Sequence, residues 1–284
     1  MNLGKIKQDL YYKTRYKAKL RSSIKISDKK MKEPVKPLKA ALHFHVFYVD
    51  LLEEIYGHLK SIKNPFTLFI TVVKDEDFDY VNKFFESHEH AFELKVLKVE
   101  NKGRDIYPFY LALHDCYKDY DIIGHFHTKK SLHSNVGDYW RKYLYGNLLG
   151  NNCLFDNILA YFAANEKVGF VTTPIVSTLT LISSYFFFKD NNADCKKDIE
   201  MALNVFGVPT DALFATKENL DFPCGNMFIA RTDAVKQFFA TELSGKEFPD
   251  EKGQLNGTLQ HFVELIWKYV VSYNGYDYKE VIKH

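Results

Sequence analysis

Three short segments of the sequence carry residue types that could do chemistry, and each follows or begins a stretch that reads as a strand. Residues 101–109 (NKGRDIYPF) load a glycine turn with amide, cationic and acidic side chains. Residues 125–131 (HFHTKKS) set two imidazoles two positions apart and follow them with two lysines. Residues 225–226 (GN) form the third. An extended i, i+2 pair faces one way, so the two imidazoles and the lysines after them are suited to neutralise a diphosphate.

Several common kinds of site are excluded. The sequence holds no Walker loop, GxGxxG, GxSxG or HExxH pattern, so the commonest NTPase, dinucleotide, hydrolase and zincin signatures are missing. His125 and His127 leave a metal site as an alternative, but two nitrogens are an incomplete ligand set. The cysteines lack CxxC spacing, which argues against a zinc knuckle or a disulfide framework. We expect reduced, mostly buried thiols at Cys116, Cys153, Cys195 and Cys224.

Short apolar runs alternate with helical patterns through the first half of the body. Alternation of this kind predicts an α/β fold with a mainly parallel sheet, right-handed crossovers and flanking helices. Ligands of such sheets bind at the carboxyl ends of the strands. The expected strands are 41–49, 66–73, 92–99 and 121–126, and the expected helices are 50–62, 77–87 and 108–117.

The second half of the sequence mixes strands and helices less regularly. We expect it to supply the acceptor side of a cleft, so that residues 40–131 form a donor-binding half and residues 132–284 an acceptor or catalytic half. The expected strands are 168–172 and 225–230, and the expected helices are 138–149, 153–164, 194–206, 232–239 and 258–273.

Composition places the 284 residues (33.2 kDa) among ordinary globular proteins. Hydrophobic residues make up 46% and charged residues 26%, which excludes wholesale disorder and a collagen-like chain. The 24 Phe and 19 Tyr suit stacking on sugars, and an aromatic-rich core explains them equally well. No stretch approaches the roughly 18 apolar residues of a membrane span, and no signal-peptide pattern is seen, so we expect a cytoplasmic protein.

Charge is divided unevenly along the chain. Residues 1–39 carry 13 Lys and Arg against 3 acids, a net charge of +10, whereas the remainder carries 25 against 33, a net charge of −8. Apolar residues at roughly helical spacing make this segment a basic amphipathic arm, which would lie on an anionic membrane surface. Pro34 and Pro37 indicate a linker that ends near residue 39, where the body of 40–284 begins. Nucleic-acid binding and a merely solvated tail are the alternatives; we expect no nucleic-acid partner.

Six motifs give the body a family resemblance. In order they are residues 43–48 (HFHVFY), 101–109 (NKGRDIYPF), 127–131 (HTKKS), 137–141 (GDYWR), 225–231 (GNMFIAR) and 256–261 (NGTLQH) with Glu264. This ordered set resembles the rhamnan synthesis protein F family of bacterial polysaccharide biosynthesis. The order of elements also resembles a nucleotide-sugar glycosyltransferase of the GT-A type.

The resemblance implies a glycosyltransferase that moves a sugar onto a lipid-linked or growing surface glycan at the cytoplasmic face of the membrane. The sugar it implies is L-rhamnose from dTDP-rhamnose. Two positions depart from these families. Asn256 stands where the family more often has Asp, and His125-Phe126-His127 stands where GT-A enzymes have the Asp-x-Asp that holds a divalent cation. We therefore expect activity without a metal cofactor.

The same resemblance suggests roles at the donor site. Tyr48 would lie near the base, and Asn101, Arg104 and Asp105 would contact base, ribose or sugar. His127 and Lys129 would carry charge for the diphosphate, which needs positive charge as it leaves. Structural alternatives stand beside each role: a loop salt bridge or helix cap for Arg104 and Asp105, a structural histidine for His127, and a solvated lysine for Lys129.

The resemblance to inverting GT-A enzymes implies a catalytic base at or just before the N-terminus of a late helix, and here that helix starts near Thr258. Glu251 is the first candidate, with Asp250 and Glu264 behind it, and the alternative is that both loop acids are only solvated. The candidates for the acceptor side or the cleft are Asp138, Arg141, Asn226 and His261. Two other readings stay open: transfer of a hexose or amino sugar, and a glycan-binding or scaffold subunit without catalysis.

Overall fold

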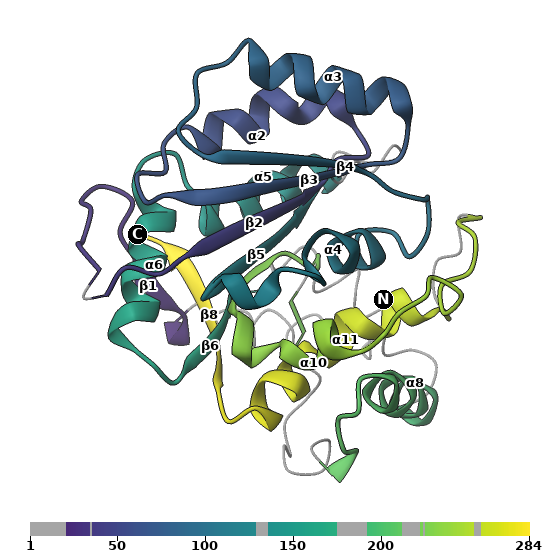
Figure 1. Cartoon of the computed structure of the whole chain (residues 1–284). Coiled ribbons are helices and arrows are strands. Elements are labelled where there is room, and N and C mark those ends of the chain that lie inside the picture. Colours follow the sequence, from purple (N-terminus) through teal and green to yellow (C-terminus); the bar gives the residue numbers. More distant parts are fainter. Residues whose placement is uncertain are drawn as a thin grey trace, which may run out of the picture.

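The computed structural model describes residues 21–34, 36–128, 136–174, 192–211, 222–223, 225–252 and 257–284. The expectations for residues 1–20 of the arm, for Lys129 and for Asn256 lie outside these residues. Within them the chain forms a three-layer α/β structure, a sheet between two layers of helices (Figure 1). The predicted fold class, a mainly parallel sheet with flanking helices, is therefore confirmed.

In the described residues the sheet has eight strands, in the order β1-β8-β6-β7-β5-β2-β3-β4. Only one of them, β7, runs against its neighbours; it pairs antiparallel with both β5 and β6. All the other pairings are parallel. The strands are β1 (Ile24–Ile26), β2 (Ala40–His45), β3 (Phe66–Val72), β4 (Glu93–Lys98), β5 (Ile122–His127), β6 (Val168–Thr172), β7 (Phe228–Arg231) and β8 (Asp277–Lys283).

The helices cover the two faces in separate groups. One layer holds α2 (Leu52–Leu59), α3 (Asp75–Glu86), α5 (Val136–Leu148) and α6 (Leu154–Ala164). The other holds α4 (Ile106–Leu113), α8 (Asn192–Val205), α10 (Lys236–Ala240) and α11 (Leu259–Tyr273). Short 3₁₀ turns occupy Val49–Leu51, Tyr117–Asp119 and Thr232–Ala234.

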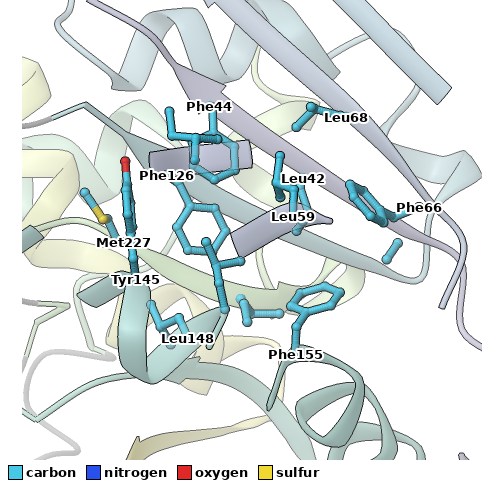
Figure 2. Packing of buried hydrophobic residues seen from close by; sticks show 14 of the residues in the cluster. Leu42, Phe44, Leu59, Phe66, Leu68, Phe126, Tyr145, Leu148, Phe155 and Met227 are labelled. Carbon is cyan, nitrogen blue, oxygen red and sulfur yellow. The ribbon is translucent and has the colours of Figure 1, made fainter. Parts of the chain in front are cut away.

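Alternate residues of the central strands divide between the two layers, as extended backbone requires. In β2, Leu42 and Phe44 join the core under α2, α5 and α6, where Phe44 stacks on Phe126 of β5 at 4.9 Å between ring centroids (Figure 2). Ala41 of the same strand faces the core under α4 and α11. Both faces of β2 and β3 are buried, which explains why these strands read as continuous apolar runs.

The segment expected to be a linker contributes to the sheet. β1 lies within residues 21–34 and pairs with β8, Ile24 opposite Val281. Asp28 accepts hydrogen bonds from the main-chain N–H groups of Asn152, ahead of α6, and Leu154, its first residue. A strand of the sheet therefore lies before residue 39, and neither β1 nor β8 was among the expected strands.

Candidate active site

Four histidines meet on one face of the sheet at the carboxyl ends of β2 and β5. The parallel register sets His43 opposite His125 and His45 opposite His127. The His43 and His125 rings stack 5.4 Å apart and only 4° from parallel, and neither is exposed. His45 retains 6% exposure at the strand end. Because Leu42 and Phe44 occupy the other face, all four imidazoles point toward α4 and α11.

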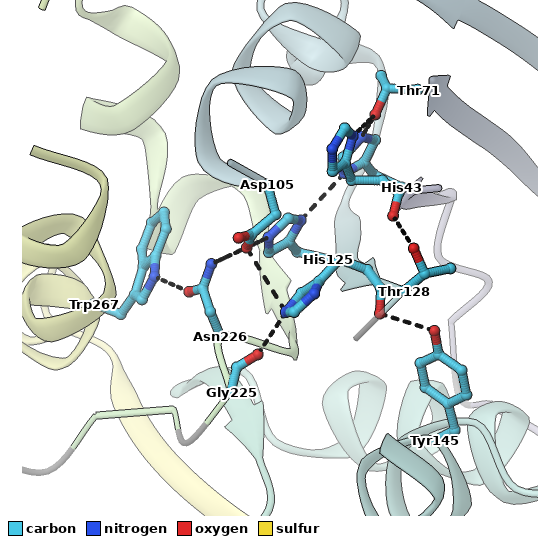
Figure 3. A network of polar contacts seen from close by, with 11 residues as sticks. His43, Thr71, Asp105, His125, Thr128, Tyr145, Gly225, Asn226 and Trp267 are labelled. Carbon is cyan, nitrogen blue, oxygen red and sulfur yellow. Dashed lines mark hydrogen bonds and ion pairs between the residues drawn. The ribbon is translucent and has the colours of Figure 1, made fainter. Parts of the chain in front are cut away.

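Asp105 reaches these histidines from the start of α4. The turn before it takes two left-handed residues in succession, Gly103 at φ 64° and Arg104 at φ 52°. A Cβ on Gly103 would lie 2.6 Å from Cβ of Tyr107, so only glycine fits there. The turn directs the buried Asp105 carboxylate at the sheet, where its Oδ2 lies 2.9 Å from Nε2 of His125 (Figure 3).

Asn226 holds Asp105 from the other side. It lies at the entry to β7 with φ 52°, an uncommon value for a residue with a side chain. The indole N–H of Trp267 in α11 can only donate, and it donates to Asn226 Oδ1 at 2.9 Å. This bond fixes the amide orientation, so Asn226 Nδ2 donates to Asp105 Oδ2 at 2.7 Å (Figure 3). Asp105 is therefore the acceptor of the group.

The surroundings of these groups set their charge. Burial alone would raise the pKa of Asp105, but the nearby His127 and the hydrogen bonds from His125 and Asn226 outweigh it and hold that pKa well below its usual range. Burial, reinforced by the neighbouring histidines, lowers the pKa of His43 well below its ordinary value and that of His45 to about 4. At neutral pH an ionised carboxylate therefore faces neutral His43 and His45.

His127 and Thr128 connect the end of β5 to the surrounding loops. His127 Nε2 donates to the carbonyl of Gly225 at 2.9 Å. The hydroxyl of Thr128 accepts from the main-chain N–H groups of Phe47 and Tyr48, at 2.8 and 3.1 Å. These bonds hold the loop that carries Tyr48 beside the exit of β5, so the side chain predicted to lie near the base is at the same edge of the sheet.

The loop with the predicted base lies over the turn before α4. Lys102 and Asp250 form an antiparallel bridge. Glu251 lies 3.7 Å from Arg104 Nε and accepts from Gln260 Nε2 at 3.0 Å, and its side chain is 14% exposed. These contacts place the Glu251 carboxylate between the Arg104 turn and the start of α11.

His261 approaches the same place from the first turn of α11. Its Nδ1 lies 2.6 Å from the hydroxyl of Thr258, and its Nε2 is buried with no hydrogen-bond partner in the described part of the chain. Burial and then the charge of Arg104 lower its pKa to about 4, so His261 is neutral at pH 7. Glu264 lies one turn further along the same helix.

Six residues that were predicted separately from the sequence lie close together in the structure: Arg104, Asp105, His127, Asn226, Glu251 and His261. Asn101 is exposed at the rim of the same loop. Asp138 and Arg141 have another arrangement. Arg141 is 2% exposed, and its guanidinium binds Glu54 of α2 through Nε and Nη2 (3.0 and 2.9 Å) and Asp138 through Nη1 (2.7 Å). This ion pair joins α5 to α2 in the layer opposite the histidines.

A metal site at His125 and His127 finds no support in these contacts. His125 uses both ring nitrogens, on His43 and on Asp105, and His127 Nε2 donates to Gly225. Among the described residues no three His, Cys, Asp or Glu side chains are arranged to hold a metal ion.

Sequence reasoning assigned no role to His43, His45, Thr71 or Trp267. The two histidines stand in an apolar run and Thr71 in the next strand, where they read as core positions. The available signal was the spacing: residues 43 and 45 repeat the i, i+2 pattern of residues 125 and 127.

Comparisons with known proteins include two curated relatives and a solved structure. The relatives are the uncharacterized protein WxcX of two Xanthomonas campestris pv. campestris strains, B100 and ATCC 33913; each is 28% identical over 238 residues, 84% of this chain. This chain spans 32% of their length. The structure is the mannosyltransferase PcManGT of Pyrobaculum calidifontis, determined with GDP-Man and Mn²⁺; it has a TM-score of 0.48 and 13% identity, covering 99% of this chain and 65% of that one.

The family comparison agrees with the resemblance drawn from the motifs. The family described as "Rhamnan synthesis protein F" matches residues 9–276, which include every element around Asp105. With a match over nearly its whole length, this chain belongs to the rhamnan synthesis protein F family.

Proposed function

We propose that this chain is a glycosyltransferase that binds a nucleotide-sugar donor at the carboxyl ends of β2 and β5 and passes the sugar to a glycan acceptor. The glycosyltransferase class follows from the family. The observation that carries the choice of site is convergence: His125 and His127 at the end of β5, Asn226 before β7 and the turn before α4 all meet at Asp105. Polar groups gathered at the carboxyl edge of a parallel sheet are the usual setting for a nucleotide.

The leaving diphosphate sets the electrostatic demand at this site. It needs hydrogen-bond donors and positive charge. In the proposal Arg104 and His127 supply these from the described residues, Lys129 adds a further charge, and Tyr48 and Asn101 contact the nucleoside. We propose that no divalent cation is required. Activity that EDTA abolishes and Mn²⁺ restores would contradict this.

The finer assignment follows the family resemblance. We propose L-rhamnose from dTDP-rhamnose as the transferred sugar, with inversion, and a cell-surface polysaccharide or lipid-linked glycan as the acceptor. The rhamnan in the family's description supports the choice of sugar. A UDP-hexose or amino-sugar donor, or a non-catalytic glycan-binding subunit, would lead to different results in the experiment that follows.

A panel of dTDP-, UDP- and GDP-sugars tests the proposal. Thermal shift reports binding and release of the nucleoside diphosphate reports transfer. We expect dTDP-rhamnose to stabilise the protein most and to be turned over with acceptor. Arg104→Gln should weaken donor binding roughly tenfold or more, the scale of a lost charge-assisted hydrogen bond. Lys236→Ala, an exposed position after β7, is the matched control. Binding without turnover of any donor would favour the scaffold reading.

Glu251 is proposed as the base, because its loop lies over the Arg104 turn at the rim of the site. Glu251→Gln keeps the size and the contact with Gln260 but removes the base. We expect turnover to fall on the order of 10² or more with donor affinity nearly unchanged. The control is Glu242→Gln, an exposed acid nearby in sequence. Near wild-type turnover would move the search to Asp250 and Glu264.

The basic arm is proposed to attach the chain peripherally to anionic lipid at the inner face of the cell membrane. Its charge supports this, since each basic residue near such a surface is worth about 1 kcal/mol. None of the helices in the described part of the chain is long and apolar enough to span a membrane. Because β1 belongs to the sheet, the test is removal of residues 1–20 only. Flotation with anionic and neutral liposomes should show salt-sensitive binding that the shortened chain loses.

A further inference from the structure

We propose that His45 is a specificity-determining residue: a directed chain of hydrogen bonds from Asp105 leaves its Nε2 as an unprotonated acceptor at the carboxyl edge, where it takes a hydrogen bond from an O–H or N–H group of the bound donor. The inference rests on the proposed function for the identity of the ligand. The direction of the chain follows from the geometry of the described residues together with a single proton on His125.

The direction is fixed first at Asp105. Trp267 orients the Asn226 amide, and Asn226 then donates to Asp105 Oδ2, so that oxygen is an acceptor. His125 Nε2 converges on the same oxygen at 2.9 Å and must carry a proton. The proposal assigns His125 this one proton, and an imidazole with one N–H at Nε2 keeps a lone pair on Nδ1.

The next two hydrogen bonds, His43 to His125 and Thr71 to His43, are donated in the same direction, toward Asp105. His43 Nδ1 lies 3.2 Å from His125 Nδ1 and donates to it. Its Nε2 is then unprotonated, and it accepts from the hydroxyl of Thr71 at 2.9 Å. A threonine hydroxyl has a single proton, so toward any other partner Thr71 acts as an acceptor.

The last bond reaches the strand end. His45 Nδ1 lies 3.0 Å from the same Thr71 oxygen, and with the Thr71 proton directed at His43 it must donate. The remaining nitrogen, His45 Nε2, is an acceptor, and it has no hydrogen-bond partner among the residues that the structure describes. Every bond in the chain therefore points toward Asp105, and the outer end presents a lone pair.

One proton would reverse the chain. A doubly protonated His125 would donate from Nδ1, and the bonds through His43 and Thr71 would turn round and leave His45 Nε2 protonated. The groups facing the chain are Asp105 from α4, Asn226 from the β7 entry, His127 from β5 and Trp267 from α11. His125 is 0% exposed and stacked on His43, and the proposal assigns it a single proton, on Nε2, which Asp105 Oδ2 accepts at 2.9 Å. The direction toward Asp105 follows from that assignment, and the spectra described next distinguish it from the reverse direction.

The direction predicts a histidine pattern that nuclear magnetic resonance reads directly. In full-length protein with ¹⁵N-histidine at pH 7, two-bond ¹H–¹⁵N spectra should show His125 protonated at Nε2, and His43 and His45 at Nδ1. Asp105→Asn should disturb this pattern, whereas Asp121→Asn, at the opposite edge of the sheet, should leave it unchanged. A proton on His45 Nε2 in the wild type would overturn the proposal.

Binding measurements test the recognition. His45→Phe removes the acceptor and should weaken binding roughly tenfold, the factor for a lost hydrogen bond, and His45→Gln, which keeps an acceptor, should recover part of it. An equal loss for dTDP and dTDP-rhamnose would place the ligand's donor on the nucleotide, and a loss for dTDP-rhamnose alone would place it on the sugar. Unchanged affinity for both would overturn the proposal.

The proposed function can fail separately. If the wild-type protein binds no nucleotide sugar, the function and the recognition step both fall, while the spectra still decide the direction of the chain. If the wild type binds and turns over donor while His45→Phe does the same with unchanged affinity, only the inference falls.

Discussion

The two faces of β2 and β5 show what it takes to bury a stacked pair of rings. On one face Phe44 stacks on Phe126 at 4.9 Å, and on the other His43 stacks on His125 at 5.4 Å. The backbone register is the same for both pairs, and all four rings are fully buried. The phenylalanine pair is stable through packing alone.

The histidine pair depends on partners in four other elements. Unpaired polar groups in such a place each cost about 1–3 kcal/mol, so the ring nitrogens must be satisfied. Two partners bond the ring nitrogens directly, Thr71 in β3 and Asp105 ahead of α4. Two more hold Asp105 in place: Asn226 ahead of β7 bonds Asp105, and Trp267 in α11 bonds Asn226. The ring pair on the polar face is therefore stable only with hydrogen-bond partners from distant parts of the chain, whereas the pair on the apolar face needs only side chains that fill the space.

The largest effect is expected on the apolar face. Phe44→Ala leaves a cavity between β2, β5 and α5 and should lower the free energy of unfolding by about 3–5 kcal/mol. Urea denaturation measures this loss. The histidine tautomers should stay as in the wild type, because none of their partners contacts Phe44. A changed tautomer pattern would show that the two faces are not independent.

On the polar face, lowering the pH should reduce the free energy of unfolding by nearly as much. The pKa of His45 is about 4 in the folded protein against about 6.5 unfolded, so the unfolded chain takes up the proton first. The neutral His45 therefore contributes about 3 kcal/mol to the free energy of unfolding above pH 6.5, and this contribution is lost as the pH falls toward 4. The difference in unfolding free energy between wild type and His45→Gln should shrink across that window. Phe44→Leu should shift the curve without changing its slope.

A smaller effect is expected at the end of the hydrogen-bond chain. Asp105→Asn preserves volume but removes the charge that accepts from His125 and Asn226, and should cost about 2 kcal/mol at pH 7. Because the pKa of Asp105 is depressed, its stabilisation is present above the unfolded value near 4 and is lost as the pH falls through the folded value. Wild type and variant should therefore converge in strong acid. A gap that persists there would assign the loss to packing.

The parts of the fold with local signals were predictable. Strands β2 and β3 are buried on both faces and read as apolar runs, and α3 begins with three acids where a helix favours them. β1 and β8 were missed because Ile24–Ile26 has only three residues and Asp277–Lys283 mixes charge into its pattern. β1 is a strand because it pairs with β8, and β8 because it pairs with both β1 and β6. These pairings join residues far apart in the sequence, so no local pattern predicts them.

The site divides in the same way. Asp105, His127 and Asn226 were proposed as site residues because each flanks a strand in a polar segment. His43 and His45 could be placed only from the parallel register of β2 on β5. Arg141 looked like a ligand contact because its partner Glu54 lies 87 residues away in sequence, in another helix.

The reversed direction of β7 has a consequence for the cohesion of the site. This four-residue strand joins two parallel half-sheets, β4-β3-β2-β5 and β6-β8-β1, and in the described strands no other pairing connects them. Asp105 and the histidines belong to one half, while Trp267 packs on Phe228 of β7 itself at 4.9 Å. Transient opening of this seam would separate Asn226 from Asp105 before either half unfolded. Amide hydrogen exchange along Phe228–Arg231 would then report how often these pairings open at the carboxyl edge, and a bound donor should slow the exchange.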